Sequence, residues 1–127
     1  MKVKGSQLMS YVFYKVMHLT GIMMTMTALG AAILQTMNSG ENRFPHKKLV
    51  GLLHGFGLLL ALVGGFGLIA RLGLDFHGWL WLKSLIWLIL GAIITLIYKK
   101  RQWGLPLWLG LIAIGGFAAW LANTKPF

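Results

Sequence analysis

Four long apolar runs separated by short polar links constrain this chain more than any other feature of its sequence. A helix that crosses the hydrocarbon core of a bilayer needs about 20 mostly apolar residues. Runs close to this length occur at about 8–37, 46–71, 79–98 and 106–122. Because the links are short, neighbouring helices must run antiparallel. We therefore predict an all-α, antiparallel four-helix transmembrane bundle, with a single domain over residues 1–127.

The overall composition supports a lipid-facing surface. The chain is 57% hydrophobic and 11% charged, and its mean hydropathy is +0.74. A soluble domain has about 25% charged residues, so much of this surface is expected to contact lipid. The sequence contains no cysteine, which excludes disulfides, thiolate metal sites and cysteine nucleophiles.

The ends of the apolar runs carry recognisable helix signals. A turn at 38–42, rich in Asn and Gly, ends the first run, and Pro45 opens the second. Pro106 falls where the first turn of a fourth helix tolerates proline. The N-terminal basic residues suggest a signal peptide, but the first run is about twice the roughly 7–15 apolar residues that such a peptide has. We interpret it as a retained first helix.

The net charge of +10 arises from twelve Lys and Arg against two acids, Glu41 and Asp75. The basic residues mostly flank the apolar runs, which favours contact with anionic lipid headgroups over nucleic-acid binding. The predicted loops on one side hold six of them: Arg43, Lys47, Lys48, Lys99, Lys100 and Arg101. The other side holds four: Lys2, Lys4, Arg71 and Lys125. The six-to-four excess predicts that both termini face the periplasm of a bacterial inner membrane.

Ionisable residues inside a bilayer are candidates for function because burying them in lipid costs free energy. His18, His54 and Lys83 meet this criterion, and Lys15 lies one turn before His18. A first stripe at helical spacing contains Tyr11, Tyr14, Lys15, His18 and Thr25, with Gly21 expected to leave space beside His18. A second contains Trp79, Lys83, Trp87 and Gly91. Both stripes start from the same side of the bundle, so we expect them to face one cavity.

A cavity with neutral histidine, lysines and tyrosine hydroxyls is electropositive and suits an anionic, largely apolar ligand such as a porphyrin. Histidine is a common haem ligand, so His18 is the first candidate ligand and His54 the second. His54 enters from the opposite side of the bilayer, and whether both bind one metal is left open. Gly51 and Gly55 in the second run have GxxxG spacing, which favours either close helix packing or room for a flat cofactor.

Two short motifs carry a resemblance to a known family. The segment 14–22 (YKVMHLTGI) resembles the first helix of HemJ-type protoporphyrinogen oxidases, and 78–83 (GWLWLK) resembles the start of their third helix. The wider group includes CopD-like and SirB-like small membrane proteins. The resemblance implies a four-helix membrane unit that binds haem b, with His18 and Lys83 important for cofactor and activity. The chain departs from the family at Leu53-His54-Gly55, where a Pro-Gly step is usual.

Two other roles fit the same sequence. Short loops and glycine-rich faces also suit a non-enzymatic accessory subunit of a membrane complex, or a homo-oligomer. The methionines of the first run, Met17, Met23, Met24 and Met26, suit copper(I) handling by a transport helper, although methionine is also an ordinary apolar filler. The sequence lacks a carboxylate pair, a Ser-His-acid set and a nucleotide-binding loop.

Overall fold

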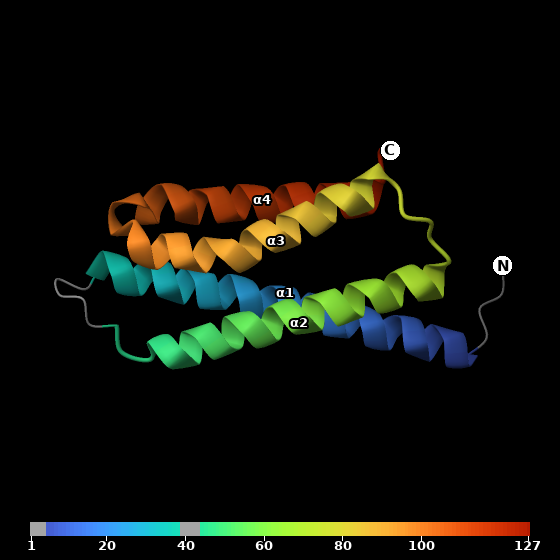
Figure 1. Ribbon diagram of the computed structural model, residues 1–127. Helices are drawn as coiled ribbons and strands as arrows, with labels where there is room; N and C mark the ends of the chain where they lie inside the picture. The colour runs from blue at the N-terminus through green and yellow to red at the C-terminus, as the bar shows by residue number, and fades with distance from the viewer. Residues whose placement is uncertain (1–4, 39–43) are drawn as a thin grey trace.

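The computed structural model describes residues 5–38 and 44–127, and these residues form an all-helical bundle (Figure 1). The helices are α1 (Gly5–Asn38), α2 (Lys47–Leu72), α3 (Gly78–Lys99) and α4 (Gly104–Thr124), with a short 3₁₀ helix η1 (Arg101–Trp103) before α4. Each of the four α-helices is long and apolar enough to cross a membrane. The predicted all-α fold class is therefore confirmed, and the expected helix ends lie within three residues of the observed ones.

The helices alternate in direction, so the ends of α1 and α4 that carry the termini lie at the same end of the bundle (Figure 1). The opposite end carries the α1–α2 connection and the turn from α3 to α4. α1 contacts all three other α-helices and packs most extensively against α2, whereas α2 and α3 touch sparsely. Residues 39–43, which include most of the predicted turn at 38–42 and Arg43, lie outside the described part of the chain, as do Lys2 and Lys4.

Local sequence signals explain where the helices end. Gly73 adopts a left-handed conformation (φ 62°) that only glycine takes without strain, and the backbone N–H of Leu74 then bonds the carbonyl of Ile69 at 3.0 Å. Pro106 lies in the first turn of α4 as predicted, because an N–H is not needed there. At the start of α3, the N–H of Trp79 donates to the carbonyl of Phe127 at 3.1 Å.

Small residues let α1 and α2 approach closely. The buried residues of α2 recur at alternating spacings of four and three, and they are Val50, His54, Gly57, Ala61 and Gly64. A Cβ added at Gly57 would lie 2.7 Å from the Thr25 hydroxyl oxygen, and one at Gly64 would lie 2.5 Å from the backbone nitrogen of His18. These distances leave no room for a side chain. We call this contact the α1–α2 seam, defined by Gly21, Thr25, Gly57, Ala61 and Gly64.

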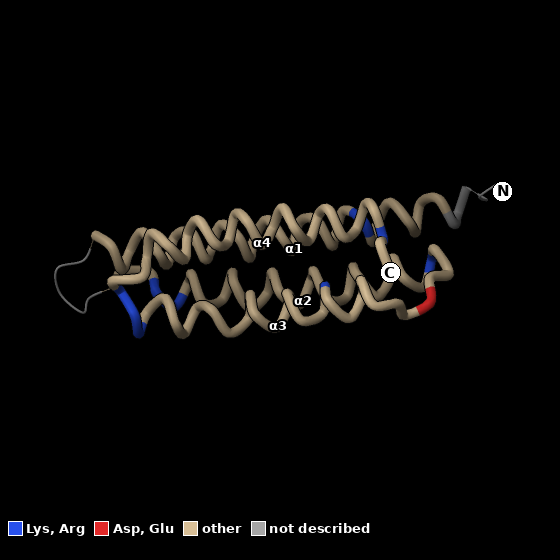
Figure 2. The backbone as a smooth tube through the Cα atoms, turned by 90° about the horizontal axis from the view of Figure 1, so that it is seen from above, with Lys and Arg blue, Asp and Glu red and all other residues tan. Residues whose placement is uncertain are grey.

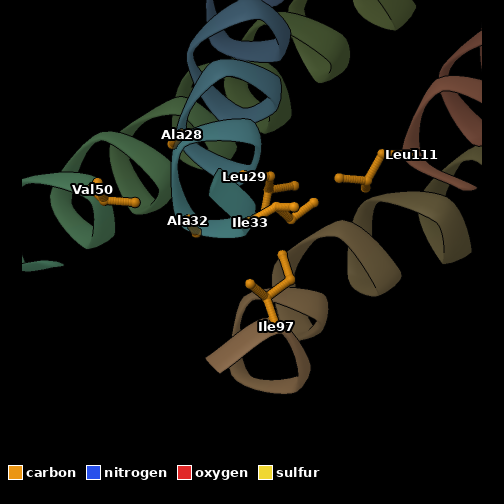
Figure 3. Close-up of a cluster of buried hydrophobic side chains, with 7 residues drawn as sticks. All are labelled: Ala28, Leu29, Ala32, Ile33, Val50, Ile97 and Leu111. Carbon is orange, nitrogen blue, oxygen red and sulfur yellow. The ribbon is translucent and has the colours of Figure 1, made fainter. Parts of the chain in front are cut away.

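Large apolar side chains join the other helices. One buried cluster gathers residues from all four α-helices near the α1–α2 loop end (Figure 3): Ala28, Leu29, Ala32, Ile33, Val50, Ile97 and Leu111. A second cluster, at the end with the C-terminus, joins α3 and α4 through Trp79, Leu80, Ile86 and Leu121. Burial of such side chains stabilises the bundle mainly through close packing, because lipid tails are themselves apolar.

The outer surface of the bundle is apolar over most of its length. Exposed large hydrophobic residues occur on every α-helix, for example Met9, Phe56, Trp81 and Ile112. In water, such an extensive apolar surface would promote association. Together with the four membrane-length helices, it identifies an integral membrane protein whose helices contact the lipid bilayer.

Candidate functional site

The first candidate ligand, His18, is half-buried on α1, where it faces α2. Its Nδ1 lies 2.7 Å from the carbonyl oxygen of Ala61. A carbonyl only accepts hydrogen bonds, so this contact assigns the proton to Nδ1. The opposite nitrogen, Nε2, then keeps its lone pair as the atom with which the neutral ring binds a metal.

Two glycines of α2 make this position of His18 possible. Gly64 lies under the backbone of His18, and a Cβ at Gly65 would lie 3.3 Å from Nδ1 of the ring. A larger residue at Gly64 would displace the histidine from Ala61, and one at Gly65 would crowd its ring. The orientation of the ring is therefore fixed by the same close approach that forms the α1–α2 seam.

Lys83 brings a positive charge into electrostatic range of this histidine. It is half-buried on α3, and its ammonium group interacts electrostatically with His18 and with Lys125. Lys125 lies over the ring of the buried Trp79, 5.4 Å from its centroid. The structure thus brings the two residues of the family resemblance, His18 and Lys83, into the same region from different helices.

The remainder of the α3 stripe turns toward α2. The indole Nε1 of Trp87 donates to the carbonyl of Leu58 at 3.0 Å. A Cβ at Gly91 would lie 3.5 Å from Cδ1 of Leu58, an ordinary packing distance. Trp87 therefore links α3 to α2, and its indole N–H is used in that contact.

The second candidate ligand, His54, lies elsewhere in the bundle. It is buried on α2, and its Nε2 lies 2.9 Å from the carbonyl oxygen of Leu90 on α3. His18 packs beside Gly64, ten residues further along α2, which corresponds to about 15 Å along the helix axis. The structure therefore does not bring His18 and His54 together around one metal ion.

The remaining residues of the α1 stripe divide between two sides of the helix. Tyr14 packs its ring on Gly67 of α2, with the Arg71 guanidinium 6.0 Å from the ring centroid. Lys15 is exposed, and its Nζ lies 5.6 Å from the centroid of the Tyr11 ring.

The predicted open spaces differ from those observed. Gly21 has the backbone of α2 against it, at Ala61 and Gly57, so it leaves no free volume beside His18. Conversely, a Cβ at Gly51 or Gly55 would meet nothing within 4 Å. Close helix packing therefore uses Gly57 and Gly64, and the GxxxG pair faces outward.

Sequence reasoning missed the partners of His18, namely the carbonyl of Ala61 and the glycines at 64 and 65. A repeat of small residues on α2, at 57, 61 and 64, could have revealed these partners. In an antiparallel pair of helices, it lies opposite the similarly spaced Gly21 and Thr25 of α1. Met23 and Met26 do not converge, because Met23 is exposed, whereas Met26 packs against the buried cluster of Figure 3.

Within residues 5–38 and 44–127, no three His, Cys, Asp or Glu side chains gather as a metal site. A haem requires only one or two protein ligands, so this finding leaves His18 as a candidate. No family model, curated protein or solved structure matches the chain. The functional argument therefore depends on the geometry around His18 and Lys83.

Proposed function

We propose that this protein binds haem b or a related porphyrin through His18, in a redox or tetrapyrrole-handling role in a bacterial inner membrane. The observation that carries the proposal is the contact between Nδ1 of His18 and the carbonyl of Ala61. Metal-bound histidines almost always donate their other ring N–H to a carbonyl, carboxylate or water, which fixes the ring and raises its basicity. Here the carbonyl of Ala61 accepts the Nδ1–H of His18, which would fix the ring and raise the basicity of Nε2 in the same way.

The charge around His18 supports an anionic ligand. The charge of Lys83 on α3 acts on this histidine, and Arg71 lies over the ring of Tyr14, which is one turn before His18. The single described acid, Asp75, is exposed in the link after α2. Lys83 and Arg71 therefore offer cations to porphyrin propionates, and the bound iron would supply the electron-transfer chemistry.

His18 is the sole protein ligand to the iron in this proposal, because His54 lies about 15 Å away along α2, too far to bind the same metal ion. Lys83 is also the candidate for moving a proton, since a lysine half-buried in a membrane interior readily changes its protonation state.

Oxidation of protoporphyrinogen is a narrower hypothesis, which rests on the family resemblance of residues 14–22 and 78–83. Placement of both termini in the periplasm rests on the six-to-four distribution of basic residues.

An absorption spectrum of the detergent-purified protein, as isolated and after addition of haem, tests the proposal. We expect a Soret band that is lost in His18→Ala and kept in His54→Leu. His77→Ala is a matched control, because His77 is an exposed loop histidine. A protein that stays colourless after haem addition, or a band that survives His18→Ala unchanged, would contradict haem binding at His18.

A second candidate function, an accessory subunit of a membrane complex, is favoured by the outer face of α4. A Cβ at Gly110 or Gly116 would meet nothing within 4 Å, so small residues are presented to the outside. Exposed small residues let a further transmembrane helix approach closely. Comigration with a fixed partner during purification, without any chromophore, would support this role over haem binding.

A further inference from the structure

A hollow lies at the end of the bundle opposite His18, where α2 begins and α3 ends. It has a volume of about 340 Å³ and is lined by Lys47, Ile94, Thr95, Tyr98 and Lys99. Two lysines thus stand beside an aromatic ring, a hydroxyl and an aliphatic side chain. This combination of cationic and apolar groups fits an amphiphilic anion.

The wall of this hollow is held in place by several contacts. The Lys47 ammonium lies 4.5 Å from the centroid of the Tyr98 ring, and the Phe44 ring packs edge-on against Tyr98 at 5.2 Å. The Tyr98 hydroxyl donates to Oε1 of Gln35 at 2.8 Å, and Nε2 of Gln35 donates to the carbonyl of Pro45. These contacts orient Tyr98 and place Lys47 at the rim before any ligand arrives.

The position of the hollow along the helices matches the level of lipid headgroups. Lys47 is the first residue of α2 and Lys99 is the last residue of α3, so both mark the end of a membrane span. Figure 2 shows basic residues at both ends of the bundle, but the described acid, Asp75, follows α2 at the end away from the hollow. Glu41 belongs to the part of the α1–α2 connection outside the described residues. Lysines at this depth attract anionic headgroups.

Exposed small residues follow the lysines on α2 and α3. Gly51 lies one turn from Lys47 on the same face of α2, and nothing would meet a Cβ there within 4 Å. On α3, Thr95 and Ala92 are exposed at one and two turns from Lys99. An acyl chain can therefore lie against α2 at Gly51, where no side chain blocks it.

We propose that this hollow is a binding site for an anionic phospholipid. The phosphate sits between Lys47 and Lys99, and one acyl chain lies along Gly51. The site is separate from the haem proposal, because it uses other residues at the opposite end of the bundle. It also differs from unspecific attraction of anionic lipids to all basic residues at this end of the bundle. The site requires Lys47 and Lys99, which line the hollow, and the exposed Gly51 one turn from Lys47.

Native mass spectrometry of the full-length, delipidated protein in detergent tests the site. Phosphatidylglycerol is the probe, and phosphatidylcholine with the same acyl chains is the comparison lipid. We expect one phosphatidylglycerol per chain to bind preferentially. The double variant Lys47→Gln/Lys99→Gln should bind it about 30-fold more weakly, since each lysine near the surface contributes about 1 kcal/mol. The matched control, Lys48→Gln/Lys100→Gln, removes the same charge outside the hollow and should change binding less than threefold.

A second variant tests the place of the acyl chain without changing the charge. Gly51→Leu places a side chain into open space, so we expect folding, checked by circular dichroism, to be retained and phosphatidylglycerol binding to fall about tenfold. Inorganic phosphate at millimolar concentration should not displace the lipid. Equal losses in the two double variants, unchanged binding in Gly51→Leu, or full displacement by phosphate would each overturn the proposal.

Discussion

The two helical hairpins of this bundle are held together in different ways. α1 and α2 meet along the α1–α2 seam, where glycines bring one backbone against the other. α3 and α4 meet through large side chains such as Leu80, Ile86 and Leu121, and Gly110 and Gly116 of α4 face open space. Glycine is thus abundant in both hairpins, but only in the α1–α2 hairpin does it bring two helix backbones together, since Gly78 and Gly104 lie against the side chains of Phe127 and Met37.

The comparison teaches that the position of a glycine relative to a neighbouring backbone matters more than its presence in a motif. In α2, Gly55 completes the GxxxG pattern yet faces outward, whereas Gly57, two residues later, packs against Thr25. Without a hydrophobic driving force between helices in lipid, close van der Waals contact is the main stabilising term. The α1–α2 hairpin should therefore be the more stable half.

The largest expected effect comes from filling the α1–α2 seam. Gly64→Leu would force its side chain into the backbone of His18, which lies 2.5 Å from the position of an added Cβ. Overpacking of this kind costs about 3 kcal/mol, and it should also displace His18 from Ala61. Unfolding in a denaturing detergent, followed by circular dichroism, measures the loss of stability.

Gly55→Leu is the matched control for that substitution, because it adds the same side chain to the same helix in open space. We expect its free energy of unfolding to be unchanged or up to about 1 kcal/mol higher than that of the parent protein, because leucine favours helix over glycine. Equal destabilisation by Gly64→Leu and Gly55→Leu would show that the seam is not the principal contact.

An intermediate effect is expected at the contact between the two hairpins. Trp87→Phe removes the indole N–H that donates to the carbonyl of Leu58, while it keeps an aromatic ring in place. Hydrogen bonds between membrane helices contribute about 0.6 kcal/mol on average, so the free energy of unfolding should fall by about that amount. A loss as large as that of Gly64→Leu would contradict the view that side-chain contacts between the hairpins are weaker than the seam.

The smallest effect is expected on the outer face of α4. Gly110→Ala adds a methyl group that meets nothing within 4 Å, and alanine favours helix over glycine by up to about 1 kcal/mol. Thermal unfolding in detergent should show an unchanged or slightly higher midpoint. A clear destabilisation would instead indicate that Gly110 packs against a second chain in the detergent-solubilised protein.

The sequence predicted the helices well because their signals are local. Apolar length is a property of each helix taken alone, and Pro106 acts within the first turn of the helix that it begins. The contact of His18 with Ala61 joins residues 43 positions apart, and it depends on the register between α1 and α2. That register is set by many small residues at once, so inspection of Gly21 alone predicted a space that α2 fills.

The α1–α2 seam also determines which parts of the molecule can move independently. Sliding one helix along the other by a single residue would shift the backbones by about 1.5 Å, more than contacts such as Gly57 on Thr25 can absorb. His18 and Ala61 therefore move together, because both belong to the rigid α1–α2 hairpin. A change in the distance between His18 and Lys83 therefore requires α3 to move relative to the α1–α2 hairpin. In that motion Lys83 is the moving group and the histidine is the fixed point.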